Sequence, residues 1–232
     1  NYSKIITVAS EEIKFFEDLG IPSEKLVHIP NGVEDKYFKK RISGLFKKKY
    51  GIEGKVILNV GRLHKTRGLD YILRAMPKIL SKCSATLCLV GPDEGEMNNL
   101  KELTKELKIQ DNVIITGRVS EQEKLNAYAD CDVFALSSLY EPFGIALVEA
   151  MAQSKPIVAT KFGGPSDILK KGGGVLVDPR DINELSKKII LFLIDEDYSK
   201  EVGEKAFERA KKYAWPLIAG HVEEQYRNLV EK

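Results

Sequence analysis

Two glutamates with seven residues between them, Glu141 and Glu149, have the residue types and spacing that most directly suggest chemistry in this chain. Pro142 and Gly144 predict a loop around Glu141, whereas Glu149 lies in a run of apolar, helix-forming residues. A helix that is apolar on nearly every face is normally buried, and a lone buried carboxylate is unfavourable unless something hydrogen-bonds it. Glu149 therefore needs a partner. A ligand hydroxyl is one candidate, and a neighbouring arginine in a purely structural pair is the other.

A basic turn follows the apolar run at residues 56–60. It begins at Gly61, is flanked by Arg62 and Arg67, and has Lys65 between them. Arginine pairs phosphate oxygens bidentately, so two guanidinium groups on one loop suit a diphosphate, with Lys65 as a further candidate cation. A solvated loop with ordinary surface charges is the alternative, because basic loops are common.

Two more turns lead into predicted helices. Phe143, Gly144 and Ile145 open the helix that carries Glu149, and free amides with the positive end of the helix dipole favour an anion there. Residues 117–119 precede a helix that is expected to begin near Ser120, with the spacing of a capping box to residue 123.

Paired carboxylates also invite a glycoside hydrolase interpretation, with one acid and one base. It is less favoured, because Glu149 would have to reach the same bond as Glu141 from within a buried helix, and the loop arginines would have no role. The Gly-x-Gly-x-x-Gly fingerprint and the Gly-x4-Gly-Lys-Ser/Thr loop are both missing from the sequence. Their absence argues against a dinucleotide oxidoreductase and a P-loop ATPase.

The elements that must position these residues alternate along the chain. Apolar runs predict strands at residues 5–8, 26–29, 56–60, 85–90, 113–116, 133–136, 156–159 and 174–177. From residue 56 onward these runs are continuously apolar, which is typical of parallel strands covered on both faces. Amphipathic helical patterns lie between them, and the helix between the first two strands is expected to be capped at Ser10. We therefore predict a doubly wound parallel α/β sheet with ligands beyond the carboxyl ends of its strands.

These motifs resemble, in order and spacing, those of retaining glycosyltransferases with the GT-B fold, specifically the family 4 group. Glu141 and Glu149 are similar to its E-x7-E motif, and residues 29–33, 61–68 and 117–119 resemble its interdomain junction, diphosphate loop and nucleobase loop. The resemblance implies a Rossmann-like GT-B C-terminal domain at residues 34–212. A partial βαβ unit of the N-terminal domain would precede it at residues 1–33, and a crossover helix would follow at residues 213–232.

The resemblance also implies roles for single residues. Arg62, Arg67 and Glu141 would be catalytic, with the arginines stabilising the leaving diphosphate and Glu141 binding hydroxyls of the donor sugar. Glu149 would bind the ribose hydroxyls. Further donor-binding residues would be Gly61, Lys65, Arg118, Val119, Phe143, Gly144 and Ile145. Family members usually carry lysine where Arg67 stands, and Arg67 keeps the charge.

The implied activity is transfer of a hexose, with retention, from a UDP-, GDP- or ADP-linked sugar to a sugar or lipid-linked acceptor. No metal and no cofactor is expected, because the basic groups would take over the task that a metal performs elsewhere. A nucleotide-sugar epimerase or phosphorylase of the same architecture, and a non-catalytic nucleotide-sugar-binding module, are the alternatives. Since the acceptor site belongs to the N-terminal domain, the isolated chain is expected to be inactive.

Composition adds broad limits. The chain has 232 residues, of which 43% are hydrophobic and 30% charged, an ordinary globular mixture. Its net charge of +2 is too near balance to argue for nucleic acid or a strongly anionic membrane surface. Three cysteines without C-x-x-C spacing argue against a disulfide framework and a structural zinc site.

A cytoplasmic location is expected, because no membrane-spanning run or signal peptide is recognised and the cysteine usage suits a reducing compartment. Apolar residues on the first strands and the last helix predict an apolar surface. We expect it to be covered by packing of that helix on the βαβ unit or by self-association.

Overall fold

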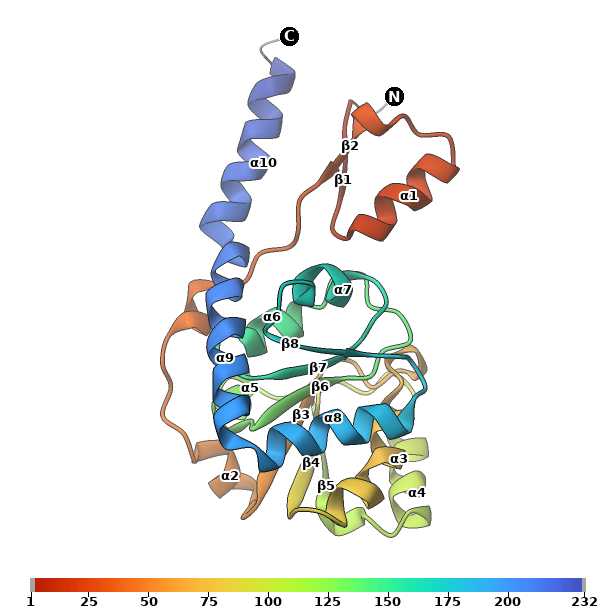
Figure 1. Ribbon diagram of the computed structural model, residues 1–232, viewed down its shortest axis with the longest axis vertical. Helices are drawn as coiled ribbons and strands as arrows, with labels where there is room; N and C mark the ends of the chain where they lie inside the picture. Colours follow the sequence, from red (N-terminus) through yellow and green to blue (C-terminus); the bar gives the residue numbers. More distant parts are fainter. Residues whose placement is uncertain (1–2, 231–232) are drawn as a thin grey trace.

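The computed structural model describes residues 3–230, and its main body is a six-stranded parallel sheet (Figure 1). The strand order is β5-β4-β3-β6-β7-β8. The bounds are β3 Lys55–Val60, β4 Ala85–Val90, β5 Val113–Gly117, β6 Val133–Leu136, β7 Ile157–Thr160 and β8 Gly174–Val177. From β3 the chain first moves outward through β4 to β5, and it then returns to β6 on the other side of β3 and moves outward through β7 to β8. The strand order therefore reverses between β3 and β6. The carboxyl ends of these two strands therefore form the crevice where α/β sheets bind ligands.

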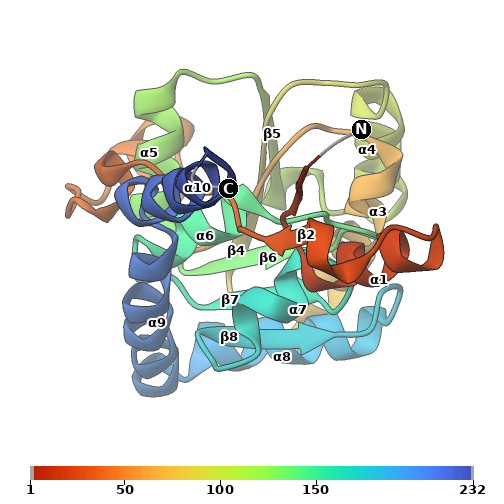
Figure 2. The ribbon, with the colours of Figure 1, turned by 90° about the horizontal axis from the view of Figure 1, so that it is seen from above.

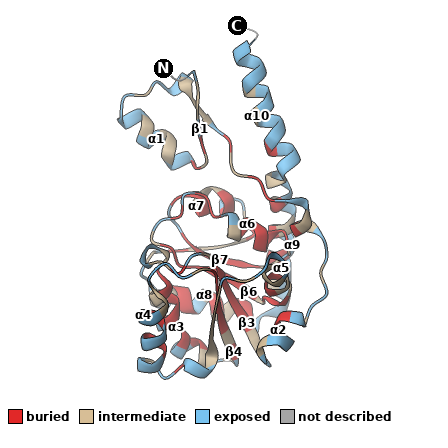
Figure 3. Ribbon diagram, turned by 180° about the vertical axis from the view of Figure 1, so that it is seen from behind, coloured by how far each residue is buried: buried red, intermediate tan, exposed pale blue. Residues whose placement is uncertain are grey.

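Helices cover both faces of the sheet, as the doubly wound prediction requires. One face packs against α3 Leu69–Leu80, α4 Met97–Glu106 and α8 Ile182–Ile194. The other packs against α2 Leu45–Tyr50, α5 Glu121–Asp130, α6 Ile145–Met151, α7 Gly164–Leu169 and α9 Glu196–Ala210. Figure 3 shows the strands buried between helices whose outer surfaces are exposed. The fold class is therefore confirmed, and all eight predicted strands are found with ends displaced by one residue at most.

Alternate side chains of β3 explain why its sequence is continuously apolar. Val56, Leu58 and Val60 enter the core on one face, and Ile57 enters the core on the other. Asn59 is the buried polar exception, and its side-chain amide donates to the carbonyl of Ala135 on β6 at 2.7 Å. This bond satisfies the amide without water.

A small unit of two parallel strands, β1 Ile5–Thr7 and β2 Leu26–His28, precedes the main domain. Its helix α1 Ser10–Asp18 connects the strands, and Figure 2 shows the unit over the carboxyl-terminal side of the sheet. Ser10 does not cap α1 as an isolated helix start would suggest, because Ala9 occupies that position. The Ser10 hydroxyl and amide donate instead to Asp167 of α7, at 2.5 and 2.7 Å. The expected cap thus became a contact between the two parts of the chain.

The last helix, α10 Trp215–Val230, extends away from the sheet beyond α9 (Figure 1). Trp215 packs on Gly32, where a Cβ atom would lie 2.4 Å from the indole ring, and this close contact ties the helix base to the segment of residues 29–33. Beyond it Leu217, Tyr226 and Val230 remain exposed. The expectation that this helix covers its apolar side on the βαβ unit is therefore wrong for the described residues, while self-association stays a prediction. Residues 231–232 of the predicted helix lie outside the described residues.

Among residues 3–230, no helix combines the length and apolar character needed to cross a bilayer. Cys83, Cys88 and Cys131 are free thiols.

Candidate functional site

A pocket of about 470 Å³ lies at the carboxyl ends of β3 and β6, at the point where the strand order reverses. Its walls come from the loops after β3 and β6, the first turn of α6, and Asn31 in the segment of residues 29–33. The lining residues are Val8, Asn31, Val60, Gly61, Arg62, Arg67, Lys124, Leu136, Glu141, Pro142, Phe143, Gly144, Ile145, Ala146 and Glu149. Both glutamates of the predicted pair and both arginines of the basic turn are therefore in one pocket.

Arg67 and Glu141 form an ion pair in this pocket, with the side chains only 15% and 11% exposed. Arg67 ends the short turn that follows β3, and its guanidinium passes over Gly61, where a Cβ atom would lie 2.8 Å from it. Its Nε is buried and has no hydrogen-bond partner within residues 3–230. A buried donor without an acceptor is unfavourable, so the guanidinium of Arg67, which lines the pocket, retains unused hydrogen-bonding capacity.

The loop that carries Glu141 is held by two glycines that precede or begin α7, Gly163 and Gly164. Gly163 has a φ of 74°, and a Cβ atom there would lie 2.0 Å from the carbonyl oxygen of Glu141. The amide of Gly164 donates to the same carbonyl at 2.9 Å. These glycines do not line the pocket, but they fix the position of Glu141 beside Arg67.

Glu149 has partners within the chain, as its burial requires. One carboxylate oxygen accepts from the Tyr128 hydroxyl at 2.7 Å, and the other accepts from Lys124 Nζ at 3.1 Å. Burial, followed by the charge of Glu149, raises the pKa of Tyr128 well above its usual value, so this hydroxyl remains a donor. The structural alternative of an arginine partner is wrong: Lys124 and Tyr128 of α5 take that place.

The amino end of α6 opens on the same pocket. Gly144 precedes the helix with a φ of 97°, a left-handed conformation that glycine adopts without strain. Ile145 and Ala146 occupy the first turn, where backbone amides lack acceptors within the helix. Their amides add to the positive character that Arg67 supplies.

Arg62 and Lys65 lie differently from what the sequence suggested. Arg62 is 63% exposed at the rim of the pocket and pairs with Glu94 at 2.8 Å. Lys65 lines a different cavity with Asp70 and Tyr71, because the tight turn from His64 to Arg67 directs the two basic side chains apart. The expectation that Lys65 shares a phosphate site with Arg67 is therefore not supported by this geometry.

Arg118 and Val119 also lie outside the pocket lining. Arg118 is exposed, and Val119 packs at the edge of the core below α5. The expected capping box is half formed: Ser120 accepts from the Glu123 amide at 3.2 Å, but the Glu123 carboxylate turns to Tyr50 and Lys49. The expected contact of this turn with a nucleobase stays a prediction.

Three polar side chains that line or support the pocket, Asn31, Lys124 and Tyr128, were not identified as site residues from the sequence. Asn31 belongs to the interdomain motif, and its place in the pocket depends on how that segment crosses the sheet. Lys124 and Tyr128 are four residues apart on α5, a spacing that puts them on one helix face but gives no hint of Glu149 as their partner.

Among residues 3–230, no group of three or more His, Cys, Asp or Glu side chains is placed to hold a metal ion. Asp130 and Asp132 stand two residues apart, but they lie at the opposite edge of the sheet and accept from backbone amides and lysines.

Comparison with known proteins gives these features a family context. Residues 43–209 match the family model of glycosyl transferases group 1. The chain is 32% identical over 219 residues to an uncharacterized glycosyltransferase of Methanocaldococcus jannaschii, covering 90% of this chain and 56% of that protein. It is 30% identical over 210 residues to N-acetyl-alpha-D-glucosaminyl L-malate synthase of Bacillus anthracis, covering 89% and 54%. The chain thus spans about half the length of these curated relatives.

Solved structures agree. Sucrose-phosphate synthase from Thermosynechococcus elongatus matches with a TM-score of 0.88 at 26% identity, over 100% of this chain and 59% of that one. Anabaena HepE in complex with UDP and glucose matches with a TM-score of 0.87 at 26% identity, over 97% and 63%. The match of the family model to most of the chain, with the sheet order and the paired glutamates, shows that this chain belongs to the glycosyl transferases group 1 family and corresponds to the C-terminal half of its GT-B members.

Proposed function

We propose that this chain is the donor-binding half of a retaining glycosyltransferase, which transfers a hexose from a nucleoside diphosphate sugar to an acceptor. The observation that carries the proposal is the buried, unpaired Nε of Arg67, in a pocket with Glu141 and the first turn of α6. A diphosphate is an anion that satisfies such donors at once.

Each pocket residue has a distinct task in this scheme. Arg67 and the α6 amides stabilise the charge that develops on the leaving diphosphate, and fixed donors at that position lower the barrier. Glu141 accepts from hydroxyls of the donor sugar while Arg67 holds its carboxylate in place. Glu149 accepts from the ribose hydroxyls, and Tyr128 keeps its carboxylate oriented. Arg62, at the exposed rim, contributes a weaker, screened attraction.

The choice of nucleotide is supported by the likeness to Anabaena HepE, whose structure contains UDP and glucose. We therefore propose UDP-hexose as the first donor to test, followed by GDP- and ADP-linked sugars. The names of the relatives mention different products, N-acetylglucosaminyl malate and mannosylfructose phosphate among them, so they do not favour one acceptor. A sugar or lipid-linked acceptor remains our proposal.

The chain by itself is proposed to bind donor without transferring it. Acceptor binding and exclusion of water need the facing domain of a GT-B cleft, and among residues 3–230 only Val8 and Asn31 line the pocket from the part of the chain before residue 34. The alternatives differ in their products. An epimerase would give an inverted sugar, a phosphorylase would give a sugar phosphate, and a binding module would give no product.

A thermal-shift series with UDP-, GDP- and ADP-sugars tests the proposal, because a ligand that binds only the folded state raises its stability. We expect one nucleotide family to raise the Tm, and its nucleoside diphosphate to do so more strongly than its monophosphate. Arg67→Ala should abolish the difference between diphosphate and monophosphate, while Lys65→Ala should leave it unchanged. No Tm change with any nucleotide sugar would contradict donor binding.

A further inference from the structure

A second concentration of charge lies at the opposite edge of the sheet from the donor pocket. Between residues 36 and 49 there are seven cations, at positions 36, 39, 40, 41, 47, 48 and 49, and no acidic residue. This segment contains the loop before α2, which stands out from the side of the domain in Figures 1 and 2. Its anchor is Asp130, which accepts from the Ser43 hydroxyl at 2.8 Å and the Phe46 amide at 2.8 Å. The net charge of the whole chain conceals this local excess.

Only part of this charge is neutralised within the chain. Lys36, Lys47 and Lys49 pair with carboxylates of neighbouring elements. The other four cations have no ion-pair partner within residues 3–230, and three of them are exposed. We call these four cations, together with the two apolar residues between them, the amino-edge surface: Lys39, Lys40, Arg41, Ile42, Leu45 and Lys48.

Two exposed aliphatic side chains lie between these cations in the sequence. Ile42 is 77% exposed and Leu45 is 48% exposed. Scattered exposed apolar residues need no explanation, but here Ile42 lies in the protruding loop, Leu45 begins α2, and cations without ion-pair partners in the described chain stand on both sides of the pair in the sequence. Apolar residues flanked by cations are the combination that inserts into the boundary between headgroups and acyl chains.

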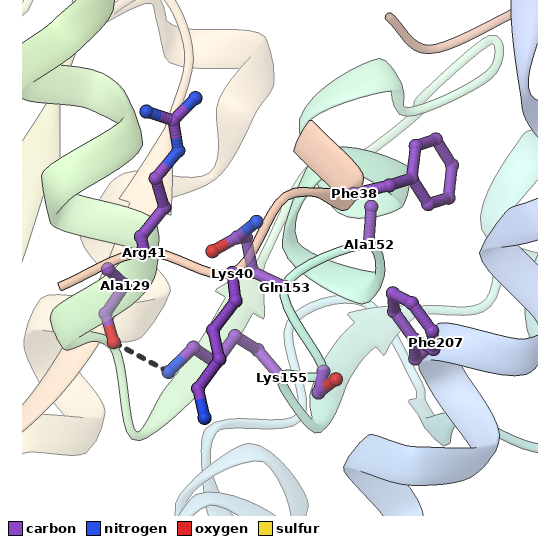
Figure 4. Close-up of a pocket in the computed structure, with 9 residues that line it drawn as sticks. Phe38, Lys40, Arg41, Ala129, Ala152, Gln153, Lys155 and Phe207 are labelled. Atoms are coloured by element: carbon purple, nitrogen blue, oxygen red, sulfur yellow. Dashed lines mark hydrogen bonds between the residues drawn. The ribbon is translucent and has the colours of Figure 1, made fainter. Parts of the chain in front are cut away.

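A cation-lined pocket of about 370 Å³ adjoins the amino-edge surface. Its lining includes Lys40, Arg41 and Lys155 and no carboxylate. Figure 4 shows Lys40 and Lys155 extending into this pocket, with Phe38 and Phe207 on its other side. Lys155 Nζ donates to the Ala129 carbonyl at 2.8 Å and has further donors free for an anion.

From this arrangement we propose that the amino-edge surface binds an anionic phospholipid membrane. Ile42 and Leu45 enter the interface, the unpaired cations attract the anionic headgroups, and the adjoining pocket takes a headgroup phosphate between Lys40 and Lys155. Nucleic acid fits less well, because single strands are bound by aromatic stacking whereas the exposed residues at the centre here are aliphatic. The donor pocket opens at the opposite edge of the sheet, so it stays accessible when the membrane is bound.

Vesicle sedimentation of the purified chain tests the proposal. We expect binding to vesicles of equal parts phosphatidylglycerol and phosphatidylcholine, weak binding to phosphatidylcholine alone, and release by high salt. The variant Lys39→Gln/Lys40→Gln/Lys48→Gln should lower the partition coefficient by roughly a hundredfold, since each cation near an anionic surface contributes about fivefold. The matched control is Lys170→Gln/Lys171→Gln/Lys200→Gln, which removes three exposed cations without ion-pair partners in the described part of the chain and should leave binding within about twofold.

The apolar contribution is tested separately. Ile42→Ser should weaken vesicle binding by about tenfold, whereas Ile194→Ser, at a residue 60% exposed on another face, should not. Equal melting temperatures of all variants establish that the fold is intact. Equal loss in the two lysine variants, no preference for anionic vesicles, tighter binding to single-stranded RNA, or self-association abolished by Ile42→Ser without vesicle binding would each overturn the proposal. None of these outcomes depends on the proposed transferase activity.

Discussion

The two edges of the sheet both carry concentrated positive charge, but they use it in opposite ways. At the carboxyl edge, Arg67 and Lys124 are largely buried and each is paired with a glutamate. At the amino edge, Lys39, Lys40 and Lys48 are exposed and have no ion-pair partner in the described chain. A buried charge must be paired and is then held in one geometry, whereas an exposed charge remains mobile and hydrated. The first arrangement suits recognition of a ligand of fixed shape, and the second suits a surface with diffuse charge.

The largest expected effect breaks the pair at the carboxyl edge. Arg67→Met should lower the free energy of unfolding by about 3 kcal/mol, because it leaves Glu141 charged in a nearly buried position. Adding Glu141→Gln should restore most of this loss, since no uncompensated charge then remains. Urea denaturation of the single and double variants measures both values. Arg62→Met, at an exposed pair, should change stability by less than about 0.5 kcal/mol. A similar loss for Arg62→Met would remove the distinction between buried and rim arginines.

A second prediction concerns the anchor of the amino edge. Burial by itself raises the pKa of Asp130, but hydrogen bonds from Gly44, Lys47 and Ser43 outweigh it and hold that pKa below its usual value. Asp130→Asn should therefore destabilise the chain by about 2 kcal/mol at neutral pH.

The pH dependence of this effect has a definite sign. A carboxyl with a depressed pKa in the folded state stabilises above its unfolded pKa of about 4, and the effect is lost as pH falls through the folded value. The stability difference between wild type and Asp130→Asn should accordingly shrink below about pH 4. Denaturation curves at a series of pH values check this, and a difference that stayed constant into acid would mean that the carboxylate charge is not involved.

Nucleotide binding distinguishes the two arginines of the donor pocket. We expect Arg62→Ala/Arg67→Ala to weaken UDP binding by about 2 kcal/mol or more, because charge-assisted hydrogen bonds contribute about 1.5–3 kcal/mol. Most of the loss should come from Arg67, since Arg62 is exposed and already paired with Glu94. Titration calorimetry of the two single variants and the double variant measures how the loss of UDP-binding free energy is divided between Arg62 and Arg67. Unchanged affinity in the double variant would reject the diphosphate assignment.

The smallest expected effect tests the ribose contact. Glu149→Gln should weaken UDP binding by about 1 kcal/mol and that of its 2′,3′-dideoxy analogue much less, because a diol donates more strongly to a carboxylate than to an amide. Lys124→Gln should be measured beside it, because this variant removes the lysine that donates to the Glu149 carboxylate. Equal losses for both ligands would leave Glu149 with a structural role only.

Much of the fold could be predicted because its signals are local. Continuous apolar runs such as residues 56–60 specify buried parallel strands, and their alternation with helical patterns specifies a doubly wound sheet. The same local signals placed Gly61, Glu141 and Gly144 in loops at the carboxyl edge, where the structure has them. The cap at Ser10 was misjudged, because its hydroxyl found a partner 157 residues away.

By itself, therefore, the sequence determined the class of fold, the order of its strands along the chain, and the presence of Glu141, Glu149 and the basic turn in one site. Only the tertiary structure decided that Arg67 rather than Lys65 faces the pocket, that Glu149 is held by Lys124 and Tyr128, and that four cations remain unpaired around Ile42. Side-chain direction within a short turn, and ion pairs between distant elements, depend on packing across the whole domain. The spacing at which apolar residues recur along the sequence carries no information about side-chain direction in a turn or about ion pairs between distant elements.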